Sequence, residues 1–286
     1  MNITYIKPTK IISYDGEFES IDSLLTCDVD QPSFHFENNF VSHGGGYVVL
    51  DFGVEISGGI RIVNQGCGAQ SDNNKIRIRF GESVSEVMFE LSEHNSTNNH
   101  SPRDFEYLLP DFSKIEVGDT GFRFVRIDFP KGINQRIYSI NAISKELDQE
   151  LLVSFNSNDE ELNKIFEVGC RTAKLCVNDY IVDGIKRDRL VWAGDLFIEL
   201  KSLIYGYGNL PEIEKTFLFL EKTNPMPSYI QNMPTYSLWY LACLNEYYKQ
   251  NGLNQFLNNR KPYIESILTI INSKINDNGS IYFDEK

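Results

Sequence analysis

The sequence has little positive charge and no long apolar run. Lys and Arg total 27 against 40 Asp and Glu, which gives a formal net charge of −13 at pH 7. A nucleic-acid-binding face needs clustered cations against the phosphates, so this composition argues against a nucleic-acid partner. No segment reaches the roughly 18 to 20 apolar residues of a membrane span, and the first residues lack the features of a signal peptide. We therefore expect a cytoplasmic protein with no membrane partner.

Metal-binding and phosphate-binding motifs are also missing. The five cysteines form no CxxC pair, so the sequence predicts neither a structural zinc site nor a disulfide framework. We expect Cys170 and Cys176 to be small core residues, and we expect the scattered histidines to bind no metal: His35, His43, His94 and His100. The two glycine runs do not open a helix after a strand as a phosphate-binding loop does. The expectation is therefore no metal and no cofactor.

Residues 1 to 148 show the two-residue alternation of β-strands. The clearest runs are residues 47–53, 59–63, 75–80 and 121–129, separated by Gly, Asn and Asp. Such runs predict an antiparallel β-sandwich. A turn is expected at Ser57-Gly58-Gly59. In the strand at 75–80, Ile76, Ile78 and Phe80 are expected to face inward, with Lys75, Arg77 and Arg79 outward. The polar, Asn-rich stretch 93–103 is predicted to be a mobile loop.

The period changes to that of helices after about residue 155. A capping-box pattern from Ser157 to Glu160 predicts a first helix, and further helices are expected over 194–205, from Pro211, over 236–250 and over 253–275. The last of these is expected to be interrupted near Pro262. Consecutive helices without strands predict a helical array over residues 149–286, as a second domain after the β-sandwich of residues 1–148.

The densest group of charged residues lies between two of these helices. Residues 183 to 195 read Asp-Gly-Ile-Lys-Arg-Asp-Arg-Leu-Val-Trp-Ala-Gly-Asp, with three carboxylates, three cations and a tryptophan. Carboxylates on a loop beside an aromatic ring suit sugar recognition and glycosidic bond cleavage. A plainer interpretation also exists: Asp195 as the cap of the following helix and Trp192 as a core anchor.

This segment resembles the active-site segment of the α-L-rhamnosidases of glycoside hydrolase family 78. The resemblance rests on the acid at position 183, the Arg-acid-Arg-Leu core around Asp188, and Trp-x-Gly-Asp from Trp192 to Asp195. It extends more weakly to the β-strand at residues 50–53 and the helix beginning at Tyr236, and so covers about residues 45 to 286. It implies a β-sandwich followed by an (α/α)6 barrel, and a hydrolysis that inverts the anomeric centre.

The resemblance also implies roles for single residues. Asp188 falls at the position of the general acid, and Arg189 is expected to fix the carboxylates. An acid of this kind has to keep its proton near neutral pH, so we expect at least one of Arg187 and Arg189 to face away from Asp188. Four further residues are expected to bind the sugar, by hydrogen bonds or ring packing: Asp183, Trp192, Asp195 and Trp239. For Trp239 a place in the helical core is the alternative.

Two departures from the family pattern bear on activity. Many family members carry Glu where this chain has Asp188, which is one methylene shorter. The family's catalytic base is a Glu farther downstream than this sequence extends, so the chain looks truncated within the barrel and impaired in catalysis. The leading hypothesis is a glycoside hydrolase acting on terminal α-L-rhamnosyl groups of an oligosaccharide or glycoside. The alternatives are a non-catalytic carbohydrate-binding protein, or a half-barrel that forms a homodimer through its exposed edge.

Overall fold

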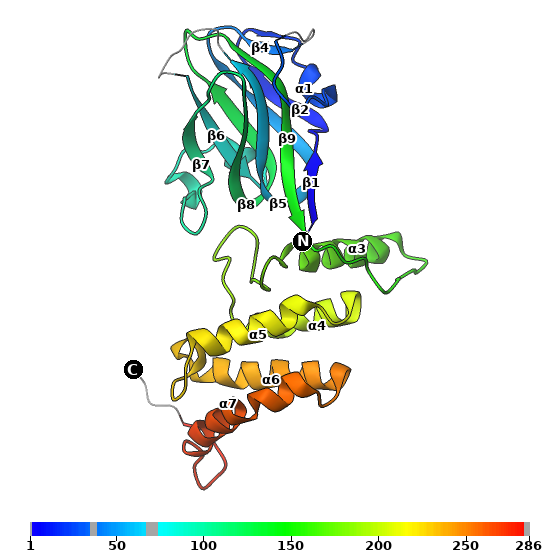
Figure 1. Ribbon diagram of the computed structural model, residues 1–286, viewed down its shortest axis with the longest axis vertical. Coiled ribbons are helices and arrows are strands. Elements are labelled where there is room, and N and C mark those ends of the chain that lie inside the picture. The colour runs from blue at the N-terminus through cyan, green and yellow to red at the C-terminus, as the bar shows by residue number, and fades with distance from the viewer. Residues whose placement is uncertain (1, 35–38, 67–73, 283–286) are drawn as a thin grey trace. The chain divides into compact units, whose positions relative to one another are not determined.

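The structure is a computed structural model that describes residues 2–34, 39–66 and 74–282 (Figure 1). By their contacts these residues divide into two compact units. The β unit comprises Asn2–Glu146 and a short later segment, Ile185–Asp188. The helical unit comprises Leu147–Gly184 and the chain from Arg189 onward.

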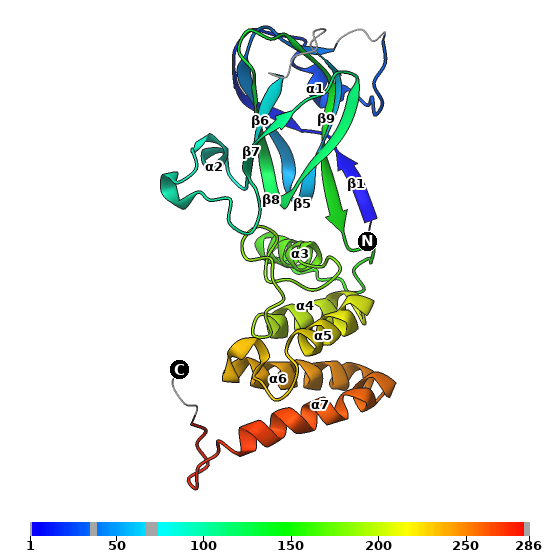
Figure 2. The same ribbon diagram turned by 60° about the vertical axis from the view of Figure 1, so that its left-hand side comes forward.

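The β unit is built on one antiparallel sheet that curls around a common core (Figures 1 and 2). The strand order is β3-β4-β9-β5-β8-β6-β7, with β1 added to β9 and β2 to β5. The strands are β1 (Asn2–Ile6), β2 (Lys10–Asp15), β3 (Phe18–Glu19), β4 (Phe40–Ser42), β5 (Gly46–Gly66), β6 (Lys75–Gly81), β7 (Asp104–Leu108), β8 (Ser113–Phe129) and β9 (Gln135–Glu146). The predicted antiparallel β structure is confirmed.

The turn predicted at Ser57-Gly58-Gly59 is wrong. β5 continues through it as one strand of 21 residues, and its pairing with β8 shifts register between Asp51 and Ile56 and again between Gly58 and Ile60. A Cβ at Gly58 would lie 2.0 Å from the carbonyl oxygen of Ile143, and one at Gly59 would lie 2.3 Å from that of Val117. The glycines therefore allow β8 and β9 to approach β5 closely, as at a bulge.

The alternation in β6 is confirmed for its inward face, because Ile76, Ile78 and Phe80 are buried in the core. On the outer face Arg79 departs from expectation, since it is only 2% exposed. Its Nη2 donates to Glu90 Oε1 at 2.8 Å. A buried guanidinium is stable only with such partners, and local alternation says nothing about what covers the outer face.

The segment around residues 82–103 crosses from β6 to β7. It contains a short helix, α2 (Val84–Met88). The sequence predicts a mobile loop over residues 93–103, but hydrogen bonds fix the end of this stretch. Asn98 Oδ1 accepts from the backbone N–H groups of Arg103 and Asp104, and Ser101 Oγ donates to the carbonyl of Asp119 at 2.7 Å. The end of this loop is thus fixed to the β unit. The other short helix of the unit is α1 (Ser23–Thr26).

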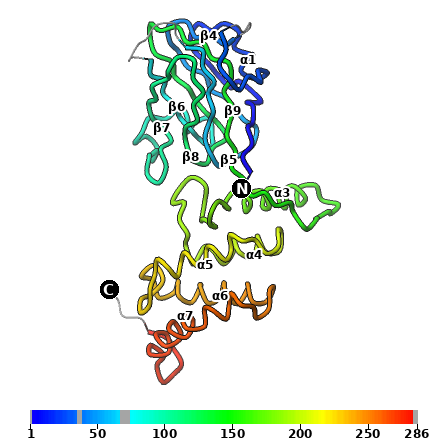
Figure 3. Tube along the Cα trace, viewed as in Figure 1, coloured from blue at the N-terminus to red at the C-terminus, as the bar shows by residue number. Residues whose placement is uncertain are grey.

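The helical unit contains five longer helices (Figure 3). They are α3 (Glu160–Leu175), α4 (Leu196–Tyr207), α5 (Pro211–Thr223), α6 (Pro234–Asn251) and α7 (Gln255–Asn272). Their shared core includes Leu200, Phe217, Tyr240 and Ile267. The helices following the strands are confirmed, whereas an (α/α)6 barrel is not, because the described residues contain seven α-helices in all, including α1 and α2.

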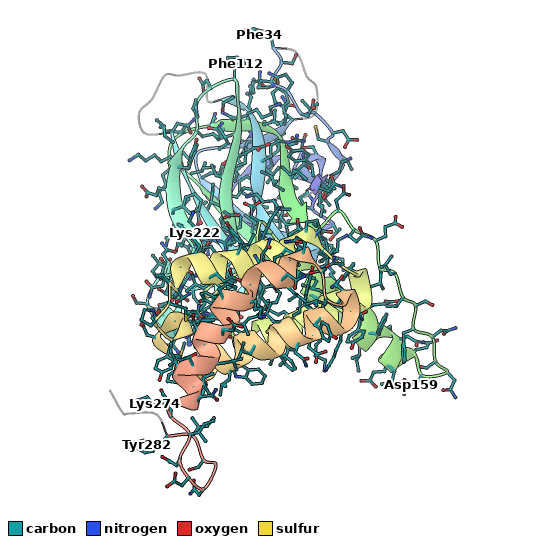
Figure 4. All side chains as sticks on the ribbon, turned by 60° about the horizontal axis from the view of Figure 1, so that its bottom comes forward. Phe34, Phe112, Asp159, Lys222, Lys274 and Tyr282 are labelled. Carbon is teal, nitrogen blue, oxygen red and sulfur yellow. The ribbon has the colours of Figure 1, made fainter. Side chains whose placement is uncertain are left out.

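Two helix details differ from the expectations. Asp159 caps α3, rather than Ser157, and its carboxylate accepts from the N–H groups of Glu161 and Leu162 (Figure 4 labels Asp159). α7 runs unbroken through Pro262. None of the described helices combines the length and the apolar character that crossing a membrane requires.

Candidate functional site

The charged segment 183–195 belongs partly to each unit. Asp183, Gly184 and the residues from Arg189 onward belong to the helical unit, and Ile185–Asp188 belongs to the β unit. Asp188 and Arg189 both have left-handed backbones, with φ of 57° and 55°. Non-glycine residues avoid this region, and residues held there cluster at binding and catalytic sites. The segment is therefore a constrained turn rather than a loose surface loop.

Backbone and side-chain hydrogen bonds close the turn on the helical side. The N–H of Asp183 donates to the carbonyl of Leu190 at 3.0 Å. In return, the N–H of Leu190 donates to Asp183 Oδ1 at 2.8 Å. One oxygen of Asp183 is thus engaged in holding the turn.

Asp195 precedes α4, but its side chain makes no capping hydrogen bond with that helix, and its own backbone is already helical. The interpretation of Asp195 as merely a helix cap is therefore not supported. The residue is exposed. Its carboxylate is not occupied by the first N–H groups of the helix.

Glu199 completes a group of three carboxylates in the helical unit. It lies one turn after Asp195 on α4. Burial, together with the charges of Asp195 and Asp183, raises the pKa of Glu199 to about 8. The carboxyl is thus mostly neutral at pH 7, as a group among other carboxylates should be. Glu199 was not among the residues predicted from the sequence, although its spacing of four from Asp195 in a predicted helix is a visible signal.

The charge of Glu199 also affects two cysteines, Cys176 and Cys243. Burial, followed by Glu199 and Asp183, raises the pKa of the Cys176 thiol to about 12. Burial and Glu199 also raise the pKa of Cys243. Thiols held protonated in this way are poor nucleophiles and poor metal ligands. Cys176 is buried as expected, and Cys170 is partly buried.

Among the residues that the structure describes, no three His, Cys, Asp or Glu side chains are arranged so that they could hold a metal ion, and this includes the three carboxylates above. His35 and Cys67 lie outside those residues.

Trp192 and the residues after it are held by α6 and the turn before it. The ring of Trp192 meets that of Tyr236 edge-on at 6.1 Å between centroids. A Cβ at Gly194 would lie 2.9 Å from Cε1 of the same Tyr236, so glycine is needed there. Trp192 is only partly buried. This leaves part of the ring accessible while Tyr236 fixes its orientation.

Gln231 fixes the backbone on both sides of Trp192. Its Nε2 donates to the carbonyl of Val191 at 2.6 Å, and its Oε1 accepts from the N–H of Ala193 at 3.1 Å. A single amide thus satisfies two backbone groups of the charged segment. No local pattern marks Gln231 in the sequence, because it lies 38 residues from Ala193.

Trp239 lies on α6 and is 42% exposed, so it is not a core residue. Its ring is 5.1 Å from that of Phe197 on α4. Trp239 thus presents an exposed ring beside the partly buried ring of Phe197, and an exposed aromatic ring is the kind of surface on which a sugar ring packs.

In the β unit, Asp188 lies beside His100. The His100 Nε2 and Asp188 Oδ1 atoms are 3.4 Å apart. Arg187 Nε is 3.9 Å from the same oxygen, but the Arg187 side chain is 90% exposed, so water screens that charge. The structure therefore brings Asp183, Asp195 and Glu199 together in one unit and places Asp188 with His100 in the other.

The fold is similar to that of solved α-L-rhamnosidases. A rhamnosidase from Klebsiella oxytoca with rhamnose bound matches with a TM-score of 0.77 at 15% identity, over 100% of this chain and 60% of that one. A family 78 rhamnosidase of Bacillus sp. GL1 matches with a TM-score of 0.68 at 20% identity, over 92% of this chain and 28% of that one. An α-L-rhamnosidase of Streptomyces avermitilis complexed with L-rhamnose gives 0.56 at 16% identity, over 92% and 25%.

No protein-family model and no curated protein sequence matches the chain. The likeness is therefore one of structure, and it confirms the predicted resemblance at the level of the fold. The chain spans 60% of the Klebsiella oxytoca protein and less than a third of the other two. The fold is that of a glycosidase-like protein in which antiparallel β structure precedes helices.

Proposed function

We propose that this chain is a glycoside hydrolase that removes terminal α-L-rhamnosyl groups with inversion. One observation carries the proposal: the segment Asp183–Asp195 that resembles the family's active-site segment occurs in a chain with the rhamnosidase fold. The left-handed backbone at Asp188 and Arg189 supports it further, because strained backbone conformations cluster at active sites and ligand-binding sites. Residues 1–148 would be the β-sandwich domain, and residues 149–286 part of an (α/α)6 catalytic domain, in a cytoplasmic protein.

In this proposal Asp188 protonates the oxygen of the leaving group. Asp183 and Asp195 accept hydrogen bonds from sugar hydroxyls, with Arg189 fixing the carboxylates. Trp192 packs on the ring. An inverting enzyme also needs a carboxylate that activates water from the opposite side, roughly 6.5 to 9.5 Å from the acid. Following the resemblance, we place that base outside this sequence, and the activity of this chain is then low.

The stereochemistry of the product tests this proposal. An aryl α-L-rhamnoside is incubated with the protein, and the anomeric protons of the released sugar are followed by NMR from the first minutes. The β anomer is expected first, with the α anomer appearing by mutarotation. Initial release of the α anomer would exclude an inverting reaction, and no release would exclude hydrolysis by this chain.

Carbohydrate binding without hydrolysis is the second candidate. It is favoured by the exposed ring of Trp239, which needs no catalytic base to hold a sugar. Calorimetric titration with L-rhamnose separates the two cases. Binding that is lost in Trp239→Ala, together with no hydrolysis, would favour this function over the first.

A homodimer is the remaining possibility, and a groove between α6 and α7 favours it. The groove has a volume of about 480 Å³ and is mainly apolar, with Leu253 72% exposed at its edge. Large exposed apolar surfaces promote association. Light scattering of the wild type and Leu253→Lys checks this: a dimer that dissociates in the variant is expected, and a monomer in both would exclude it.

A further inference from the structure

In the β unit, Asp188 lies beside a histidine from a distant part of the sequence. Asp188, the proposed general acid, lies 3.4 Å from Nε2 of His100, a residue 88 positions earlier in the chain. Both residues belong to the same compact unit. The imidazole of His100 and the exposed guanidinium of Arg187 both lie beside Asp188.

The loop that carries His100 is fixed to the sheet. Ser101, the next residue, is buried, and its hydroxyl donates to the carbonyl of Asp119 on β8 at 2.7 Å. Three residues further back, Asn98 closes the loop by accepting from the N–H of Arg103 at 3.0 Å. The backbone of His100 itself is left-handed, with φ of 68°. The imidazole therefore projects from an anchored turn.

The segment that carries Asp188 is fixed to the same part of the sheet. Ile185 packs directly on Gly121 of β8, where a Cβ would lie 2.6 Å from the Ile185 side chain. Lys186 Nζ lies 2.9 Å from Glu82 Oε2 and 2.7 Å from Glu86 Oε1 at α2. Both partners of the contact are thus attached to β8 within the short stretch from Asp119 to Gly121. Such a shared support holds two side chains in register better than two independent loops do.

We propose that His100 is a positioning residue for the general acid, and that the β unit therefore contributes directly to catalysis. The inference rests on the proposed function. In this role the imidazole N–H is expected to donate to Oδ1 of Asp188 once substrate binds, so that the acidic proton is held on the other carboxyl oxygen, Oδ2, for transfer to the leaving group. At 3.4 Å the contact is long for a hydrogen bond, as catalytic contacts often are before substrate binds.

Substrates with different leaving groups distinguish this role from a structural one. A 2,4-dinitrophenyl rhamnoside leaves without protonation, whereas a 4-methoxyphenyl rhamnoside needs the acid. For His100→Ala we expect kcat/KM to fall about 10- to 100-fold on the methoxyphenyl substrate and less than about 3-fold on the dinitrophenyl one. His100→Gln, which keeps an N–H donor, is expected to recover part of the loss. Equal losses on both substrates would overturn the proposal.

His43 offers a matched control. Its Nε2 lies 3.4 Å from Glu19 Oε2, the same distance and chemistry at another place in the β unit. His43→Ala is expected to leave both rates unchanged. A loss in His43→Ala that equals the loss in His100→Ala would show a general effect on folding and would overturn the proposal.

A measurement without substrate separates the failure of this inference from that of the proposed function. The ring ¹⁵N shifts of His100 are expected to change in Asp188→Asn, while those of His43 stay the same. Unchanged His100 shifts would show that the contact is absent and would overturn the positioning role even in an active enzyme. If the His100 shifts change but the wild type hydrolyses neither substrate, the proposed function is wrong and the positioning role falls with it.

Discussion

Asp51 in the β unit and Glu199 in the helical unit are carboxylates in opposite surroundings. In the β unit Asp51 accepts two hydrogen bonds from Arg123, at 2.8 and 2.9 Å, and this contact holds the pKa of Asp51 below its usual range. In the helical unit Glu199 has carboxylates as neighbours, and burial together with their charges raises its pKa to about 8. A pair of opposite charges stabilises the folded chain. Like charges held close together lower its stability and are characteristic of functional sites.

Asp104 is the buried anion of an ion-pair cluster in the β unit. This side chain is 2% exposed, and its two oxygens accept from Nε and Nη2 of Arg77, each at 2.7 Å. Asp104→Asn removes the buried anion that Arg77 and the buried Arg79 share and leaves them with the half-exposed Glu90, so we expect a loss of about 3–5 kcal/mol in the free energy of unfolding. Urea denaturation measures it. A loss below about 1 kcal/mol would show that water already solvates the arginines.

Removing the Glu199 carboxylate from the helical unit is expected to raise the free energy of unfolding, whereas Asp104→Asn lowers it. Below the ordinary Glu pKa of 4.5, Glu199 is protonated in both states and costs nothing. As the pH rises from 4.5 to about 8, the unfolded chain loses this proton first, so stability falls, and the full penalty is present above about pH 8. Glu199→Gln removes the penalty. We expect about 2 kcal/mol of stabilisation at pH 9, after discounting for partial exposure, and almost none at pH 4.

Thermal unfolding of the wild type and Glu199→Gln at pH 4 and pH 9 measures this difference. A destabilised variant at pH 9 would show that the ionised Glu199 has a favourable partner. The comparison between the two units would then fail.

The smallest expected change in the free energy of unfolding is at Asp51, where the substitution is again destabilising. Because the folded pKa is lowered, the pair contributes stability above the usual Asp pKa of 3.8 and loses it as the pH falls through the folded value. Asp51→Asn is expected to cost about 1 kcal/mol at pH 7, since Arg123 is partly exposed, and nothing in strong acid. Acid titration of unfolding, with Asp15→Asn on the exposed end of β2 as the control, checks this.

The sequence predicted the features that depend on local pattern. Alternation placed Ile76, Ile78 and Phe80 in the core of the β unit, and the change of period placed the helices. Capping and breaking residues were less decisive. Asp159 outcompetes Ser157 as the cap of α3, and tertiary packing carries α7 through Pro262.

The candidate site could be located from its motif, but its environment could not. Glu199 becomes significant only because folding brings Asp183 beside α4. His100 meets Asp188 across 88 positions, and Gln231 meets Val191 across 40, so no window of sequence contains either contact. The roles of Asp183, Arg189, Trp192, Asp195 and Trp239 stay predictions.

The rate of hydrolysis of 4-nitrophenyl α-L-rhamnoside by the wild type, Asp188→Asn and Glu199→Gln tests the central claim most directly. Asp188 is proposed as the acid, and Glu199 as a neutral neighbour of the sugar-binding carboxylates. The account predicts a loss of at least about 100-fold in kcat/KM for Asp188→Asn and a much smaller loss for Glu199→Gln. Activity retained in Asp188→Asn but lost in Glu199→Gln would contradict it, because the proton would then come from the helical unit.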